Sequence, residues 1–253
     1  MTVPLHHALQ DGGARAWQLP VDASCAGMAR SLLTSTLVSA GLPEDLIDAA
    51  ALAVSELATN ALVHAAYGGS PQSRMTMELW TYARMCPKPQ LVVSIFDACR
   101  RWKNGRKDSD AFEEHGNGLT IVSAVTEGWD VHLTRARLAP SPTPGKAVHC
   151  ALALPSNWLR PYAADVTPAQ AARRLANFLT ARGIPLDLNG GLNGVYLLRV
   201  PPDLNVWIEP QAFAFKPGDA DRIRRPFFDL ESVTESVLHY HEQHTAARAP
   251  GPR

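Results

Sequence analysis

Apolar residues recur at helical spacing in two long stretches near the start of the chain. The first stretch covers residues 24–40 and is followed by Gly41, a residue that commonly ends helices. The second begins at Pro43, which suits a first helical position, and runs to about Ala66. The apolar stripes of the two expected helices are Met28, Leu32, Leu33, Leu37 and Val38, and then Leu46, Ala50, Val54, Leu57 and Ala61.

Shorter apolar runs predict strands at residues 16–19, 74–82, 90–96, 129–133 and 147–154, with a third helix at 119–126. The stretch from Ala98 to His115 is polar, basic and without period, which is typical of a lid or binding loop. These elements form a first unit at residues 16–155, preceded by a flexible arm at 1–15.

A second unit is predicted at residues 161–245, followed by a disordered tail at 246–253. Thr167-Pro168-Ala169-Gln170 has the residues of a capping box, so a helix should start there and end at Gly183. Strands are expected at 184–188, 195–200, 204–208 and 213–215, and a last helix at 229–243. This order favours a small α+β domain, in which we find no catalytic motif.

Composition excludes several classes of protein. The 24 basic and 24 acidic residues give a net charge of zero, which argues against a protein built to grip nucleic acid or an anionic membrane. No apolar run approaches the roughly 18–20 residues of a membrane span. The four cysteines form no C-x-x-C pair, which argues against a disulfide framework or zinc ribbon, so we expect a reduced, cytoplasmic protein. His239, His241 and His244 have metal-compatible spacing, but no cluster of carboxylates or cysteines joins them, which favours a solvated helix face.

The second helix carries the most informative polar residues. Glu56, Asn60 and His64 are spaced four apart, one position before the core residues Leu57 and Ala61. The polar side chains should therefore lie at the edge of the core. An amphipathic helix with an ordinary wet side would show a similar pattern.

Three later segments change the balance between these interpretations. Asp97 closes the apolar strand 91–96, Gly116-Asn117-Gly118-Leu119 enters the third helix, and Gly145-Lys146 precedes the last strand of the first unit. Together with Glu56-x-x-x-Asn60, these segments resemble the GHKL ATPase/kinase superfamily, over residues of about 16–154. The branch they resemble is the anti-sigma-factor serine/threonine kinases, also called switch-protein kinases.

The resemblance implies a two-layer α/β sandwich, with three helices on one face of a mixed, mostly antiparallel sheet. It also implies an ATP site made by Asn60, His64, Asp97, Gly116, Asn117, Gly118, Leu119 and Lys146. The chemistry of the side chains is consistent with such a site. The Asn60 carbonyl is a neutral oxygen ligand for Mg²⁺, Glu56 could act as general base, and Asp97 could accept from the adenine amine. Gly116 and Gly118 would let backbone N–H groups approach phosphates.

Two departures from the family pattern concern the lid and the base site. Ala98-Cys99-Arg100-Arg101 stands where the family commonly has glycines, and Lys146-Ala147 lacks a hydroxyl often found in that turn. Arg100 and Arg101 could contact phosphates when a lid closes, or they could belong to a solvated basic loop.

The implied function is that of a Mg²⁺-ATP-dependent protein serine/threonine kinase in a partner-switching system. Its substrate would be an anti-sigma antagonist, and a sigma factor could be a further partner. A homodimer is compatible with this prediction, and direct nucleic-acid or membrane binding is not expected. Two alternatives stay open: a non-catalytic regulator that binds ATP and captures a partner, and a weak ATPase.

Overall fold

The computed structural model describes residues 7–67, 76–100, 118–159, 166–190, 192–218 and 220–248, which form two five-stranded sheets with helices. The first sheet has the strand order β1-β2-β3-β5-β4 and the second has the order β10-β9-β8-β7-β6. Neighbouring strands are antiparallel throughout both sheets. The predicted α/β sandwich is confirmed, although its sheet is antiparallel rather than mixed.

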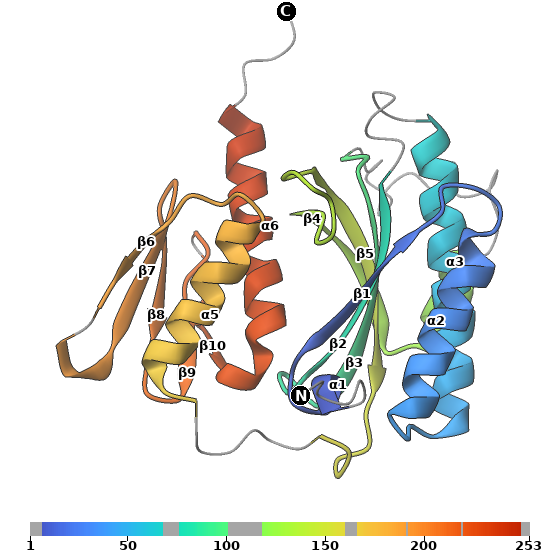
Figure 1. Ribbon diagram of the computed structural model, residues 1–253, viewed down its shortest axis with the longest axis horizontal. Helices are drawn as coiled ribbons and strands as arrows, with labels where there is room; N and C mark the ends of the chain where they lie inside the picture. The colour runs from blue at the N-terminus through green and yellow to red at the C-terminus, as the bar shows by residue number, and fades with distance from the viewer. Residues whose placement is uncertain are drawn as a thin grey trace, which may run out of the picture.

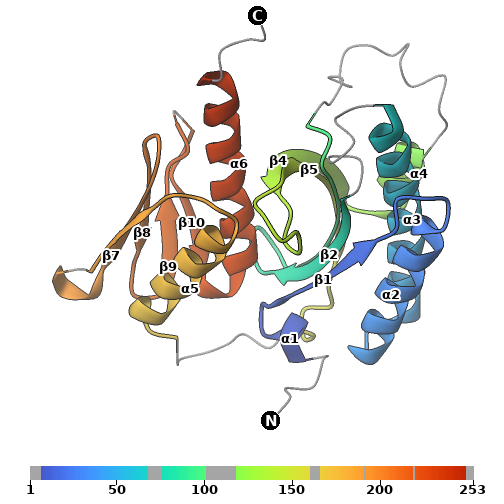
Figure 2. The ribbon, with the colours of Figure 1, turned by 45° about the horizontal axis from the view of Figure 1, so that its top comes forward.

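The first domain contains all the elements that the sequence motifs occupy. Its helices are α1 (His7–Gln10), α2 (Cys25–Ser39), α3 (Glu44–Tyr67) and α4 (Gly118–Val125). Its strands are β1 (Ala14–Leu19), β2 (Met77–Arg84), β3 (Gln90–Asp97), β4 (Gly128–Arg135) and β5 (Pro144–Ala153). Helices α2, α3 and α4 cover one face of the sheet (Figures 1 and 2).

Local sequence accounts for the ends of the two long helices. Gly41 has a φ of 69°, a left-handed conformation that glycine adopts without a steric cost, and it separates α2 from α3. Glu44 and Asp45 lie in the first turn of α3, where the helix dipole favours carboxylates.

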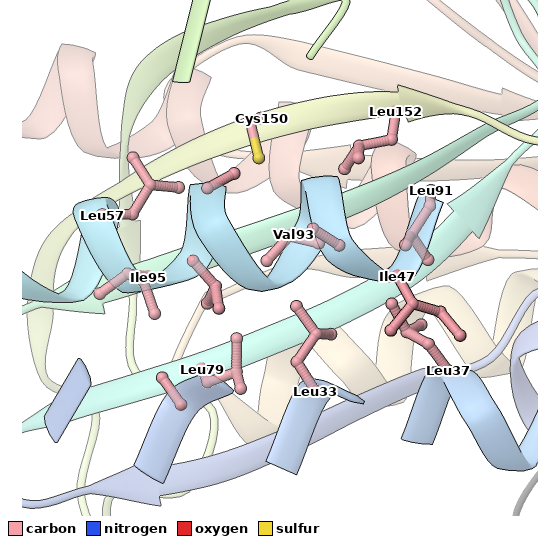
Figure 3. Packing of buried hydrophobic residues seen from close by; sticks show 14 of the residues in the cluster. Leu33, Leu37, Ile47, Leu57, Leu79, Leu91, Val93, Ile95, Cys150 and Leu152 are labelled. Atoms are coloured by element: carbon pink, nitrogen blue, oxygen red, sulfur yellow. The ribbon is translucent and has the colours of Figure 1, made fainter. Parts of the chain in front are cut away.

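The core of the first domain lies between these helices and the sheet, and Figure 3 shows its middle. Helix α3 and strand β3 run in the same direction here. Ile47 of α3 lies near Leu91 of β3, and Leu57 lies near Ile95 (Figure 3). The next turn of α3, which holds Asn60, is therefore at the same end of the core as Asp97.

The second domain is built on its own core. It contains α5 (Pro168–Ala181), α6 (Leu230–Arg248) and the short 3₁₀ helices η3 (Leu192–Gly194) and η4 (Phe227–Asp229). Its strands are β6 (Asp187–Asn189), β7 (Tyr196–Val200), β8 (Leu204–Ile208), β9 (Ala212–Phe215) and β10 (Ile223–Pro226). The predicted capping box is confirmed, since Thr167 Oγ1 accepts from the Gln170 N–H at 3.2 Å and Gln170 Oε1 accepts from the Thr167 N–H at 2.9 Å.

Helix α6 packs against the first sheet as well as its own (Figures 1 and 2). The first sheet is therefore covered on both faces, by α2, α3 and α4 on one and by α6 on the other. This arrangement explains why nearly every residue of β2 and β3 is buried, although antiparallel strands often have one wet face.

Several sequence predictions differ from the structure at the edges of the domains. The predicted flexible arm at 1–15 contains α1 and the start of β1, and α6 extends to Arg248, inside the predicted tail. Strand β10 was not expected, because Ile223–Pro226 is short and rich in arginine. Beyond Pro155, Trp158 still packs on the first core and donates from Nε1 to the Ala40 carbonyl at 3.0 Å.

Helix α3 has the length and hydropathy of a membrane-crossing segment over Glu44–Val63, which the sequence analysis did not identify. Its mean hydropathy is 1.5, and 44% of the window is buried. The apolar residues that raise its hydropathy, among them Val54 and Leu57, belong to the core of the first domain. Core packing accounts for the composition of this helix.

Candidate functional site

Glu56 and Asn60 lie on α3 beside its buried stripe, as the spacing predicts. Both residues are half-buried, while Leu57 and Ala61 are almost completely buried. His64 lies one turn further along α3, but its side chain is outside the described part of the chain.

The start of α4 lies directly against these two polar side chains. A Cβ atom built on Gly118 would be 2.8 Å from Glu56 Oε2, 3.4 Å from Asn60 Nδ2 and 3.5 Å from Asn60 Oδ1. Real Cβ atoms do not approach other atoms as closely as the first of these distances. The glycine therefore lets the first turn of α4 approach Glu56 without displacing its carboxylate. Leu119, the next residue, is half-buried and packs against the first core.

Asp97 lies on the face of the sheet that the helices cover. Strand side chains alternate between faces, so Asp97 shares a face with Ile95 and Val93, which pack in the first core. Asp97 is 0% exposed, at the end of β3.

Lys146 of β5 lies opposite Asp97 in the antiparallel register and is also buried. Its Nζ donates to Asp97 Oδ1 at 2.7 Å and to the Cys99 carbonyl oxygen at 2.8 Å. The Cys99 N–H donates to the same Asp97 Oδ1 at 2.9 Å. Asp97 Oδ2 has no hydrogen-bond partner among the described residues.

The environment of Asp97 opposes its ionisation. Burial raises the pKa of Asp97, while the Lys146 ammonium and the Cys99 N–H act in the opposite direction. The net effect is a raised pKa, although a cation lies in contact with the carboxylate.

Gly145 allows β5 to approach the end of β3 closely. A Cβ atom on Gly145 would be 2.3 Å from the Asp97 carbonyl oxygen and 2.6 Å from the Phe96 ring. The position next to Lys146 therefore has to be glycine for Asp97 and Lys146 to meet in this register.

Arg100 contacts α6 in this structure, and its contact with phosphates when a lid closes stays a prediction. It forms an ion pair through Nη1 with Glu242 of α6, and Nη2 donates to the Glu242 carbonyl oxygen at 3.1 Å. The same carboxylate accepts from Arg135 Nε at 2.6 Å. Arg101, Gly116 and Asn117 lie outside the described residues.

The sequence analysis expected the three C-terminal histidines to form a solvated helix face, and this prediction is wrong. His239 Nδ1 accepts from the Leu133 N–H at 3.0 Å, so it contacts the first domain. His241 lies 2.8 Å from the Pro201 carbonyl oxygen and His244 lies 2.7 Å from the Tyr240 carbonyl oxygen. Within the described ranges, no group of three His, Cys, Asp or Glu residues is arranged to hold a metal ion.

The described side chains fit a purine nucleotide with a magnesium ion. Asp97 Oδ2 is a buried acceptor for which the described residues offer no donor, and the exocyclic amine of adenine is a donor. Glu56 and Asn60 offer hard oxygen atoms beside a helix N-terminus, and Mg²⁺ commonly takes one or two protein oxygens with water and phosphate.

Sequence reasoning identified Asp97 and Lys146 but not the contact between them. It placed Lys146 in the site only through the family resemblance. The signal for the contact is the pairing of β3 with β5, which requires the strand order of the folded sheet.

Part of the first domain matches a known protein family. Residues 19–138 match the model of the histidine kinase-like ATPase domain family. A solved structure, the histidine kinase domain from the Erythrobacter litoralis EL346 blue-light activated histidine kinase, is similar at 21% sequence identity and a TM-score of 0.30. That alignment covers 59% of this chain and 70% of the other. No protein of curated function matches the chain. The family match over residues 19–138 supports the placement of the first domain in the GHKL superfamily of histidine kinase-like ATPases.

Proposed function

We propose that this chain is a Mg²⁺-ATP-dependent protein serine/threonine kinase that phosphorylates a partner protein, of the anti-sigma antagonist type, in a partner-switching system. The observation that carries the proposal is the contact of Gly118 with Glu56 and Asn60. It brings a general base candidate, a metal ligand candidate and a helix N-terminus to one place.

Each side chain has a role that its chemistry allows. Asn60 Oδ1 would be a ligand of the magnesium ion without adding negative charge beside the triphosphate. The bound ion would neutralise charge on the phosphates. Glu56 would accept the proton of the attacking serine hydroxyl, and Asp97 Oδ2 would accept from the adenine amine.

A second candidate function is supported by the position of Arg100. Its ion pair with Glu242 keeps a cation of the lid segment on α6, away from Glu56 and Asn60. A protein that binds ATP and captures a partner without transferring phosphate has no need of this cation near the phosphates. A transcription-regulatory role through a sigma factor would be compatible with either function.

One assay separates these functions. The full chain is mixed with γ-labelled Mg-ATP and a candidate antagonist protein. Label on a serine of the antagonist supports the kinase, bound nucleotide without transfer supports the binding protein, and free phosphate alone supports a weak ATPase.

Two variants test the assigned roles. Glu56→Gln should keep nucleotide binding and lower phosphate transfer by about 10²–10⁴-fold, the contribution of a general base. Asn60→Ala should weaken nucleotide binding in the presence of magnesium but not in its absence. Thr59→Ala is the matched control, since Thr59 is exposed on the same turn of α3 and its hydroxyl donates to the Ser55 carbonyl oxygen of the same helix. Unchanged transfer in Glu56→Gln would refute its role as base.

A further inference from the structure

We propose that Lys146 is a positioning residue for base recognition, which fixes the Asp97 carboxylate so that only Oδ2 is presented to the amine of adenine. The inference rests on the proposed function, because it takes Asp97 as the acceptor for the base. It gives a specific role to Lys146, which lies outside the matched segment 19–138.

Two donors converge on one oxygen of the Asp97 carboxylate. The Lys146 ammonium and the Cys99 N–H both donate to Oδ1, at 2.7 Å and 2.9 Å. The two carboxylate oxygens are equivalent, so a rotation that exchanges them restores the same arrangement. In either orientation one oxygen faces the two donors and the other faces away. Among the described residues, the carboxylate therefore has one defined acceptor without a donor.

Lys146 is itself held at two points. Its Nζ also donates to the Cys99 carbonyl oxygen at 2.8 Å, and its side chain is 1% exposed. The ammonium thus connects β5 to the backbone that follows β3, and it cannot move without losing both bonds. A neutral side chain of similar length could pack in this place but would not hold the carboxylate.

The free oxygen would be costly without a ligand. A buried acceptor without a donor loses its hydration and gains nothing in return, and such atoms are uncommon in folded proteins. Asp97 Oδ2 is such an atom among the described residues. A ligand that donates one hydrogen bond at this point would satisfy it.

The charge of Lys146 also favours the ionised form of Asp97. Burial raises the pKa of Asp97, and the ammonium is the main described group that opposes this effect. The neighbours that face Asp97 are Lys146 from β5, Cys99 after β3 and the apolar Met77 from β2. Without the ammonium the carboxyl group would take up a proton more readily, and a protonated oxygen that donates cannot serve an amine donor.

The test compares two nucleotides that differ only in the group that Asp97 would recognise. The full-length protein is titrated with Mg-ATP and with the triphosphate of purine riboside, which lacks the 6-amino group. The wild-type protein should prefer ATP by about 10- to 100-fold, the range of a hydrogen bond to a charged group. Lys146→Met should reduce this preference to less than about threefold, through weaker ATP binding and unchanged binding of the analogue.

The matched control is Lys88→Met, which removes a lysine charge from an exposed ion pair with Glu127. It should keep the wild-type preference. A wild-type preference in Lys146→Met would overturn the inference, and so would an equal loss of affinity for both nucleotides, because a purely structural role predicts that result.

The outcomes distinguish this inference from the proposed function. Absence of nucleotide binding by the wild-type protein, or equal affinity for the two nucleotides, would contradict the base site of the proposed function. If the wild-type protein discriminates and Lys146→Met discriminates equally, only the role of Lys146 fails.

A second measurement covers the case in which Lys146→Met does not fold. The chain has five lysines (Lys88, Lys103, Lys107, Lys146 and Lys216), and Lys146 is the buried one among the described residues. In wild-type protein with ¹⁵N-labelled lysine, the protected ammonium signal should shift more with ATP than with the analogue. Equal shifts with both nucleotides would overturn the inference.

Discussion

Two buried charge clusters lie on opposite faces of the first sheet, and they differ in how fully their carboxylates are bonded. On the helix-covered face, Asp97 has one bonded oxygen and one without a partner in the described chain. On the face toward α6, Glu235 has both oxygens bonded. Oε1 accepts from Arg137 and Arg182 at 2.8 Å and 2.7 Å, and Oε2 accepts from Thr134 at 2.7 Å and lies 3.1 Å from His132 Nε2.

The difference agrees with a structural role for the Glu235 cluster and with the ligand-binding role proposed for Asp97. The bonds of Glu235 join β4 and the loop after it to the C-terminal domain, and its carboxylate has little capacity left for a ligand. The bonds of Asp97 fix its position but leave one oxygen without a donor in the part of the chain that the structure describes. The bonds on the α6 face hold the two domains together, and the proposed ligand site lies on the opposite face.

The two carboxylates also depend on pH in opposite directions. Burial opposes ionisation of Glu235, but Arg182 and Arg137 outweigh it and hold the pKa of Glu235 well below 4.5, its ordinary value. Its contribution to stability is therefore complete above 4.5 and is lost as the pH falls through the lowered pKa. Asp97 has a raised pKa, so its contribution is present below 3.8 and is lost as the pH rises.

The largest expected effect is on the structural cluster. Glu235→Ala leaves Arg137 and Arg182 buried without their shared carboxylate. The free energy of unfolding should fall by about 3–5 kcal/mol, as for other buried ion pairs that lose one partner. Urea unfolding measures this change.

The matched control is Glu209→Ala on the second sheet. Glu209 also pairs with two arginines, Arg222 and Arg224, but their side chains are 61% and 63% exposed. This variant should cost no more than about 1 kcal/mol. Equal effects of the two substitutions would contradict the structural role of Glu235.

The next effect is the pH dependence of stability that arises from His149, whose ring contacts His132 of the structural cluster. Burial, assisted by the neighbouring His132, lowers the pKa of His149 to about 3 from an ordinary value of 6.5. The unfolded chain takes up a proton that the folded protein excludes, so stability falls as the pH drops below 6.5. The loss attributable to His149 between pH 6.5 and pH 5 should be about 2 kcal/mol.

This prediction is checked with urea unfolding of wild-type protein and His149→Asn over that pH range. On acidification, the free energy of unfolding should fall less in the variant than in the wild type. The difference should equal the loss attributed to protonation of His149 in the unfolded chain. Parallel pH profiles for the two proteins would show that His149 is protonated in the folded state as well.

The smallest of these effects concerns nucleotide affinity at the proposed site beside Glu56. Gly118→Ala places a Cβ atom 2.8 Å from Glu56 Oε2, so the Glu56 side chain must move away from the start of α4. Affinity for Mg-ATP should fall by about tenfold, equivalent to about 1.4 kcal/mol. Isothermal titration measures it.

Gly27→Ala is the control for this substitution, since a Cβ atom there meets nothing within 4 Å. It should leave nucleotide affinity unchanged and stabilise α2 by about 0.5–1 kcal/mol. Full affinity in Gly118→Ala would place the nucleotide phosphates away from Glu56.

The sequence predicted the helices and strands best where local chemistry defines them. Gly41 ends α2, Thr167 and Gln170 start α5, and the apolar runs of β3 and β5 read as buried strands. It also placed Glu56 and Asn60 at the edge of the core, because their spacing relative to Leu57 fixes their side of α3.

The sequence did not predict the role of α6. Glu231, Glu235, His239 and Glu242 follow one stripe of this helix, a pattern that could have indicated a partner rich in arginine. A stripe of acidic residues on a helix usually faces water, and only the docked sheet supplies the arginines that bury this one.

The amino-acid sequence by itself determines the chemical group that each position offers. Asn60 offers a neutral oxygen and Asp97 a hydrogen-bond acceptor, while Lys146 and Arg100 are cations. The tertiary structure decided how these groups are used. Lys146 meets Asp97 because β5 pairs with β3, and Arg100 meets Glu242 because α6 lies across the sheet. Residues so distant in sequence meet only through strand order and domain docking, which depend on the packing of the whole molecule rather than on any local pattern.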